Sequence, residues 1–283
     1  MIRAEAWAKV NLTLRITGRR MDGYHLLSSI FAKINLKDDI SFTPSARNVT
    51  LTCSDPSIPA DGRNLAVRAA MALRGKMDME NGVAMDLIKR IPVAAGLGGG
   101  SSDAAATLAV LNRMWGVNLP EEELAEMALK LGADVPFFQN GAMAHVEGIG
   151  EKITPLAPQK PIPVLLANPG FGIRAQDAYK GSIFDFRPVE NLEGLISAAT
   201  SGDPARLATF ITNDLEPWAM GKYPALAALR MAMERTEPAP LAVAMSGSGP
   251  TMFAIHSTAE RMEAAAKGLA GAAPFVYPAM TLV

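Results

Sequence analysis

The chain contains little of what metal, redox and nucleic-acid-binding proteins depend on. Its 283 residues include one cysteine and three histidines, and the formal net charge is −1. The lone Cys53 excludes an internal disulfide framework and Cys-rich zinc or iron–sulfur sites, and His25, His145 and His256 are too scattered for a helical HExxH-type motif. Because affinity for a phosphate backbone comes mainly from excess Lys and Arg, the near-neutral charge argues against a general nucleic-acid binder. Any anion that the protein binds must be bound locally.

Long apolar runs are also missing. No run reaches the roughly 18 residues that suggest a membrane span, and the start, Met1 to Glu5, has no charged segment followed by an apolar one. We therefore expect a cytoplasmic protein that binds neither membrane nor nucleic acid. The composition, 49% hydrophobic and 19% charged, is ordinary for a globular protein.

The length and one proline-rich stretch predict two domains. At about 150 residues per domain, a chain of this size holds two domains or one large one. Prolines gather at Pro155, Pro158, Pro161 and Pro163, and such a cluster favours a boundary there. We expect an N-terminal domain over 1–155 and a C-terminal domain over 156–283.

Apolar and polar residues alternate from Ile2 to Ile16. This period of two predicts a long strand with one buried face and one available face, bent near its middle. Lys9 and Asn11 lie on the available face. Further along, Asp22-Gly23 predicts a turn before Tyr24 and His25.

Capping residues and apolar periodicity predict the remaining elements. In the first half these are helices over 65–74, 101–115 and 120–132 and a strand over 83–91, with Asn64 as a helix cap and Gly75 as a helix end. In the second half they are a strand over 164–167, helices across 192–216 and over 224–235, strands over 241–245 and 252–255, a helix over 259–269 and a strand from Phe275. Allowing for an extra helix, the second half has the order βαββαβ, which is the ferredoxin-like arrangement.

A run of glycines between a predicted strand and a predicted helix is the strongest motif. Glycines let backbone N–H groups converge without Cβ obstruction, and the helix N-terminus behind them adds unpaired donors and a dipole that favours anions. The run therefore predicts a phosphate cradle whose serines cap the helix and offer hydroxyls to phosphate or Mg²⁺; the alternative is a flexible loop with a capping serine. The residues of this predicted cradle are Pro92, Val93, Ala94, Ala95, Gly96, Leu97, Gly98, Gly99, Gly100, Ser101 and Ser102.

This loop is neither a Walker A nor a protein-kinase motif. It lacks a Lys after its last Gly, and the chain has no Asp-Phe-Gly or His-Arg-Asp. Residues 92–102 resemble instead the Pro-x-x-x-Gly-Leu-x-Ser-Ser loop of the galactokinase, homoserine kinase, mevalonate kinase and phosphomevalonate kinase (GHMP) family. The longer form, Gly-Leu-Gly-Gly-Gly-Ser-Ser-Asp-Ala, resembles the branch of that family that acts on 4-diphosphocytidyl-2-C-methyl-D-erythritol.

Residues 8–12 with 22–25, residues 131–138 and residues 246–251 also resemble that branch, in the family's order. The resemblance implies a two-domain α+β GHMP-kinase fold. Its N-terminal domain would be ribosomal-protein-S5-like, bind ATP and carry the catalytic residues. Its ferredoxin-like C-terminal domain would contribute to substrate binding.

Asp134 and Lys9 are the predicted catalytic residues. Phosphoryl transfer to an alcohol needs a carboxylate to orient or deprotonate the hydroxyl and a cation to offset the developing charge. Asp134 follows a predicted helix end, and the Val135-Pro136 after it disfavours helix at residue 135. Taken alone, Asp134 suits a turn and Lys9 an exposed strand. The resemblance implies that Asp134 is the base and that Lys9 pairs with it and faces the transferring phosphoryl group.

The resemblance also implies a substrate site. Tyr24 and His25 would hold the cytosine, Asn11 would contact the methylerythritol end, and Tyr179 would supply a second aromatic face, although Ala175 stands where the family usually has a small hydroxyl residue. Gly247 and Ser248 would belong to a loop that closes the site. From the residues alone, Tyr24 is a partly buried tyrosine, His25 a surface histidine, and the stretch 246–250 a hairpin turn.

The function implied is transfer of the γ-phosphate of ATP, with Mg²⁺, to the 2-hydroxyl of 4-diphosphocytidyl-2-C-methyl-D-erythritol, a step of the non-mevalonate isoprenoid route. The expected enzyme is a monomer or weak homodimer. The alternatives are a kinase for homoserine or a mevalonate-type alcohol, and a non-catalytic nucleotide-binding sensor of the same fold. The segment Asn213–Glu216 also resembles a family segment, without an assigned chemical role.

Overall fold

A computed structural model describes all residues, 1–283. Its packing divides the chain into two compact units. Unit 1 comprises Met1–Ala8, Leu36–Pro92 and Gly98–Asn140, and unit 2 comprises Lys9–Asn35, Val93–Leu97 and Gly141–Val283. Each unit takes segments that are far apart in the sequence, so the units are not sequence domains, and the boundary near residue 155 stays a prediction.

Unit 1 is a sheet with helices. It contains the start of β1 (Ile2–Arg19), the end of β2 (His25–Ser45), β3 (Val49–Cys53) and β4 (Gly82–Ile88). β4 pairs antiparallel with β2 and parallel with β3. The helices are α1 (Leu65–Lys76), α2 (Gly99–Met114), α3 (Glu121–Leu131) and α4 (Val135–Gln139).

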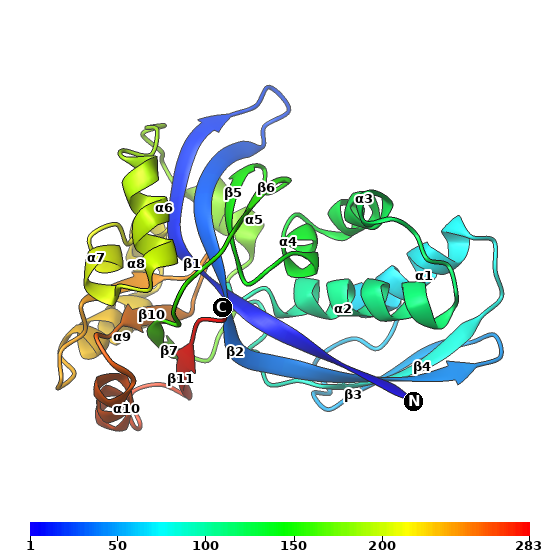
Figure 1. Cartoon of the computed structure of the whole chain (residues 1–283). Helices are drawn as coiled ribbons and strands as arrows, with labels where there is room; N and C mark the ends of the chain where they lie inside the picture. Colours follow the sequence, from blue (N-terminus) through cyan, green and yellow to red (C-terminus); the bar gives the residue numbers. More distant parts are fainter. The chain divides into compact units, whose positions relative to one another are not determined.

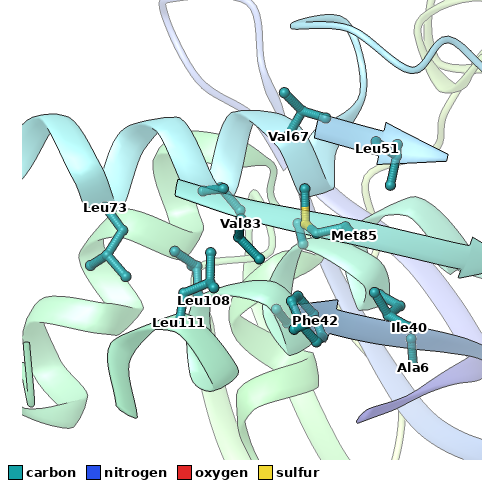
Figure 2. Packing of buried hydrophobic residues seen from close by; sticks show 14 of the residues in the cluster. Ala6, Ile40, Phe42, Leu51, Val67, Leu73, Val83, Met85, Leu108 and Leu111 are labelled. Atoms are coloured by element: carbon teal, nitrogen blue, oxygen red, sulfur yellow. The ribbon is translucent and has the colours of Figure 1, made fainter. Parts of the chain in front are cut away.

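The core of unit 1 lies between this sheet and the helices α1 and α2 (Figure 2). Ile40, Phe42 and Val83 come from the strands, and Leu73 and Leu108 from the helices; all are fully buried. Each such side chain contributes about 1.5–3 kcal/mol when it leaves water. This core anchors α2, the helix that follows the glycine run.

Unit 2 contains the remaining parts of β1 and β2, drawn in blue in Figure 1, and a second sheet. β5 (Met143–Gly148) pairs with β2 and with β6 (Lys152–Leu156), and β8 (Thr212–Asn213) pairs parallel with β1. The second sheet has the order β11-β7-β10-β9, formed by β7 (Pro163–Asn168), β9 (Ala242–Met245), β10 (Met252–Ile255) and β11 (Phe275–Met280). Neighbouring strands in this sheet all pair antiparallel.

The helices of unit 2 are α5 (Ala175–Gly181), α6 (Leu192–Ser201), α7 (Pro204–Ala208), α8 (Glu216–Lys222), α9 (Pro224–Glu234) and α10 (Ala259–Gly268). The strands of the second sheet and the helices between them have the order βαββαβ: β7, the helices α5 to α9, β9, β10, α10 and β11. This order confirms the ferredoxin-like arrangement. None of the helices combines the length and apolar character that crossing a bilayer requires.

Most predicted elements are present. The differences from the prediction concern one helix end, one interrupted helix and a few short strands. Asn64 caps α1 by accepting from the Ala66 N–H, but α1 continues through Gly75 to Lys76, so the predicted end at Gly75 is wrong. The helix predicted across 192–216 is broken into α6, α7 and the strand β8. β3, β5 and β6 were not predicted, because each is only five or six residues long and short runs carry little periodic signal.

The two faces of β1 are both covered in its middle. Ala8, Val10 and Leu12 are fully buried, as the alternation predicts. Lys9 and Asn11, on the face predicted to be available, are each only 2% exposed. The prediction of an open face is therefore wrong here, because polar side chains fill that face and bond to one another.

His256 follows β10 and is fully buried, with no hydrogen-bond partner for either ring nitrogen. Burial, and then the charge of Arg261, lower the pKa of His256. Below about pH 6.5, the unfolded chain therefore binds a proton at His256 that the folded protein does not bind. His256 thus lowers the free energy of unfolding as pH falls below that value, by at most about 1.4 kcal/mol per pH unit, and leaves it unaffected above.

We expect the His256→Leu variant to be at least as stable as the wild type at pH 7.5 and to lose stability less steeply down to pH 5. Urea unfolding at several pH values measures both slopes. His25 and His145 also have lowered pKa values but are unchanged in the variant, so the difference reports His256. Equal slopes would contradict the prediction.

Candidate active site

Lys9 and Asn11 meet on β1. The Lys9 ammonium donates a hydrogen bond to Asn11 Oδ1 and lies 4.4 Å from the centroid of the Phe31 ring, a cation–π contact. Asn11 Nδ2 donates to Ser29 Oγ over 3.1 Å. Burying an ammonium is costly unless partners hold it. Lys9 is therefore a held, buried charge and not a solvated strand lysine.

The turn between β9 and β10 lies against these two side chains. Asn11 donates its backbone N–H to Ser246 Oγ (3.2 Å), and that hydroxyl donates to the Gly96 carbonyl (2.9 Å). A Cβ on Gly247, whose φ is +56°, would lie 3.0 Å from Asn11 Oδ1 and 3.5 Å from Lys9 Nζ. The structure thus brings Gly247 to Lys9 and Asn11, and Ser248 follows in the same turn. The predicted hairpin connection is confirmed.

The first part of the glycine run, Val93–Leu97, belongs to unit 2. The Leu97 carbonyl accepts from the Lys9 N–H (3.0 Å), and the Ala95 carbonyl accepts from the Thr251 N–H (3.3 Å). Gly96 has a φ of +77°, and a Cβ there would overlap the Ser246 carbonyl oxygen at 2.0 Å, so this position requires glycine. Backbone contacts therefore fix this part to the strand and turn that carry Lys9 and Gly247.

The second part, Gly98–Ser102, belongs to unit 1 and begins α2. Gly98 is the N-cap, in the left-handed conformation, and no side chain caps the helix. Ser101 and Ser102 lie inside the first turn, so the prediction that a serine caps this helix is wrong. The first N–H groups of a helix have no intrahelical partner, and with the dipole they make an anion site.

Asp134 occupies the N-cap position of α4, where its side chain makes no capping hydrogen bond. The prediction that Val135-Pro136 prevents helix at 135 is wrong, because a proline in the first turn lacks only an N–H that would have no partner. A Cβ on Gly132 would lie 4.0 Å from Ser101 Oγ, so the segment before α4 packs close to the first turn of α2. Asp134 and Lys9 belong to different units, and their pairing stays a prediction.

A buried charge cluster lies beneath the same turn of α2. Lys89 donates to Asp38 and, over 2.8 Å, to Asp103 Oδ2, and all three side chains are at most 7% exposed. Asp38 Oδ1 also accepts from the backbone N–H groups of Arg90 (2.6 Å) and Ile91 (2.9 Å). Burial raises the pKa of Asp103 to about 7, with Asp38 adding to the rise and Lys89 opposing it.

An aromatic cluster forms around His25 in unit 2. The His25 ring stacks on Tyr179 at a centroid distance of 5.6 Å and an angle of 19°, and it meets Phe184 edge-on at 4.8 Å. Phe186 lies 6.4 Å away. Tyr24 is 62% exposed. The structure brings His25 and Tyr179 together, stacked on each other, so it is the outer faces of this pair that remain for a base to stack on.

Comparison with known proteins connects these features. The family model of the GHMP kinases N terminal domain matches residues 64–142, and that of the GHMP kinases C terminal matches residues 195–273. A 4-diphosphocytidyl-2-C-methyl-D-erythritol kinase from Prosthecochloris aestuarii is 39% identical over 270 residues, covering 95% of this chain and 93% of that protein. The chain belongs to the GHMP kinase family. The enzyme of the same name as this relative, from Chlorobium phaeobacteroides, is 40% identical, covering 90% of this chain and 87% of that protein.

Solved structures agree with this GHMP kinase assignment. A crystal structure of 4-(cytidine 5'-diphospho)-2C-methyl-D-erythritol kinase superposes with a TM-score of 0.83 at 33% identity, covering 99% of each chain. A homoserine kinase from Cytophaga hutchinsonii superposes with a TM-score of 0.73 at 17% identity, covering 100% of this chain and 94% of that one. The second likeness concerns the fold alone. The predicted two-domain α+β GHMP-kinase fold is confirmed.

Phe184 and Phe186 of this GHMP kinase were not among the residues predicted for the site. Both lie between α5 and α6, outside any helix or strand. The available signal was two aromatic residues, separated by one residue, in a segment without apolar periodicity shortly after Tyr179. Aromatic residues in such a segment have no core to fill, which favours a binding role.

Proposed function

We propose that this GHMP kinase transfers the γ-phosphate of ATP to the 2-hydroxyl of 4-diphosphocytidyl-2-C-methyl-D-erythritol, in the supply of isoprenoid precursors. The relatives that span almost the whole chain carry the name of that kinase. The observation that carries the proposal is the aromatic cluster of His25, Tyr179 and Phe184. A cytosine can stack on such rings, whereas a small acid such as homoserine has no ring that could stack there.

In the proposed reaction the substrate hydroxyl oxygen bonds to the γ-phosphorus while the bond to the bridging oxygen of ADP breaks. Asp134 accepts the hydroxyl proton, and Lys9 offsets the charge on the transferring group. Asn11, held by Lys9 and Ser29, contacts the methylerythritol end of the substrate. Residues 92–102 bind the ATP phosphates through backbone N–H groups. Tyr24, His25 and Tyr179 bind the cytosine, and Phe184 joins them.

Magnesium is part of this proposal. The chain contains no group of three or more His, Cys, Asp or Glu side chains that could hold a metal ion. Mg²⁺ in kinases is bound by one or two protein groups together with substrate phosphates, so the residues present fit an ion that arrives with ATP. The Ser101 hydroxyl, half-buried in the first turn of α2, would be a protein ligand. When bound, the ion neutralises charge on the β- and γ-phosphate oxygens.

Two alternatives remain distinct. A homoserine- or mevalonate-type kinase would share the fold, and the homoserine kinase likeness supports the fold alone. A nucleotide sensor would keep the anion site but would not need Lys9 buried on β1. We further propose that the enzyme acts in the cytoplasm as a monomer or weak homodimer, with sequence domains over 1–155 and 156–283.

A coupled ADP-release assay tests the function. With ATP and Mg²⁺, we expect turnover of 4-diphosphocytidyl-2-C-methyl-D-erythritol and little or none of homoserine or mevalonate. The Phe184→Ala variant should raise the KM for the cytidyl substrate by about tenfold or more, since base stacking on an aromatic ring contributes about 1–3 kcal/mol.

Phe171→Ala is the matched control for that variant. Phe171 also pairs with another ring, Tyr223, at 5.2 Å, but belongs to none of the proposed sites. Its KM should stay near the wild-type value. Preferred turnover of homoserine or mevalonate would refute the cytidyl assignment, and ATP binding without ADP release from any alcohol would favour the sensor.

A further inference from the structure

The segment Asn213–Glu216 holds backbone groups of two other segments with its side chains. Asn213 Nδ2 donates to the carbonyls of Met245 (2.6 Å) and Gly247 (2.8 Å), and Asn213 Oδ1 accepts from the Leu215 N–H (2.9 Å). Asn213 is 7% exposed. All three hydrogen bonds of this buried amide are thus made to backbone groups, two of them at one turn.

Glu216 and Asp214 complete the arrangement. Glu216 Oε2 accepts from the Met245 N–H (2.7 Å), and its other oxygen pairs with Arg230. Asp214 Oδ2 accepts from the N–H of Ile16 on β1 (2.8 Å). Side chains of one short segment therefore hold both backbone groups of Met245, the last residue of β9, and tie them to β1.

The turn held in this way is the one that lies against Lys9 and Asn11. Because the peptide unit is planar and trans, fixing the Gly247 carbonyl also fixes the Ser248 N–H, which points the opposite way, away from Asn213. Gly247 in turn limits the space beside Asn11 Oδ1 and Lys9 Nζ. A shift of this turn would change the surroundings of both side chains without altering either of them.

We propose that Asn213 is a positioning residue for the alcohol side of the reaction: its amide sets the turn Ser246–Gly249 against Lys9 and Asn11. This inference rests on the proposed function for its kinetic consequence only. The placement of the turn is a property of the unliganded protein and is tested separately.

Asn213→Asp is the informative variant. It has the same shape and keeps the acceptor for Leu215, but it places a carboxylate against two carbonyls. Asn112→Asp is the matched control, because Asn112 is also 7% exposed and its amide likewise clamps backbone, accepting from the Leu119 N–H (2.8 Å) and donating to the Leu119 carbonyl (3.2 Å). Asn112 lies near the far end of α2 from the glycine run.

Three measurements separate positioning from general destabilisation. Hydrogen exchange in the peptide covering 245–251 of the unliganded enzyme should speed up in Asn213→Asp and stay unchanged in Asn112→Asp. The kcat for the cytidyl alcohol should fall by about 10- to 100-fold in Asn213→Asp alone, since misplacement by about 1 Å can cost 10²-fold. The Kd of CDP, measured by calorimetry, should stay within about twofold, because the aromatic cluster is not held by Asn213.

The outcomes are distinct. Unchanged exchange in residues 245–251 of Asn213→Asp overturns the proposal, as does wild-type kcat. Equal losses of kcat, CDP binding and melting temperature in both variants also overturn it, because they indicate a general structural role. A wild-type enzyme that does not phosphorylate the cytidyl alcohol refutes the proposed function, while accelerated exchange confined to Asn213→Asp still supports the placement of the turn.

Discussion

Replacing Asp134 with asparagine is expected to lower ADP release by about 10²–10⁴-fold, because an amide cannot accept the hydroxyl proton. The substitution keeps the shape of the side chain. It removes no helix cap, since the Asp134 side chain makes no capping hydrogen bond to α4. Melting temperature and the Kd of ATP should therefore stay close to the wild-type values. The coupled assay, thermal unfolding and calorimetry measure the three quantities.

Asp203→Asn is the control for this substitution. Asp203 is also an N-cap aspartate, but its carboxylate does accept hydrogen bonds from the Ala205 and Arg206 N–H groups of α7. Any change should appear in stability and leave turnover unaffected. Substantial turnover by Asp134→Asn would remove Asp134 from the role of base and leave it at most an orienting group.

The predicted partnership of Lys9 and Asp134 can be tested by combining variants. Lys9→Met keeps an unbranched chain over the Phe31 ring while removing the charge. If the two residues act as a unit, Lys9→Met should lose about as much turnover as Asp134→Asn, and the double variant little more. Multiplying losses would mean that they act independently.

How far the sequence leads depends on whether a residue acts through its neighbours in the chain or through distant ones. Asn64 caps α1, and the helix over Glu121–Leu131 runs between Pro120 and Gly132, because caps and breakers act locally. The interruption of the predicted 192–216 helix at β8 is different. There Asn213 bonds to Met245, 32 positions away, and nothing local records that partner.

The candidate site divides in the same way. The anion site at the glycine run can be predicted from the sequence, because it depends on local backbone geometry between a strand and a helix. The burial of Lys9 cannot be predicted in this way. Alternation places Lys9 on an available face, and that face is covered by Phe31 and the Ser246–Gly249 turn, which are distant from Lys9 in the sequence. For Lys9, the resemblance to the family predicts a place in the site that the periodicity of the sequence does not indicate.

The largest expected effect on stability comes from Lys89→Met. Removing this ammonium leaves Asp38 and Asp103 as two buried carboxylates without their shared cation. Breaking a buried pair on one side costs about 3–5 kcal/mol of the free energy of unfolding, measurable by urea unfolding at pH 7.5. Lys76→Met, which removes a partly exposed partner of Glu123, should cost at most about 1 kcal/mol. Similar costs for both variants would contradict the prediction.

The pH dependence identifies the cause. The pKa of Asp103 is raised to about 7, above its unfolded value, so the folded state binds the extra proton and this contribution to stability is lost as pH rises through 7. Without Lys89 the carboxylates bind protons more readily still. Lys89→Met should therefore regain stability as pH falls from 8 to 6, and adding Asp103→Asn should restore stability at pH 7.5. Because Lys89 donates to Asp103 near the start of α2, its ammonium also holds the part of α2 that follows the glycine run. A folded Lys89→Met enzyme should then bind ATP more weakly, which links the buried cluster to the anion site above it.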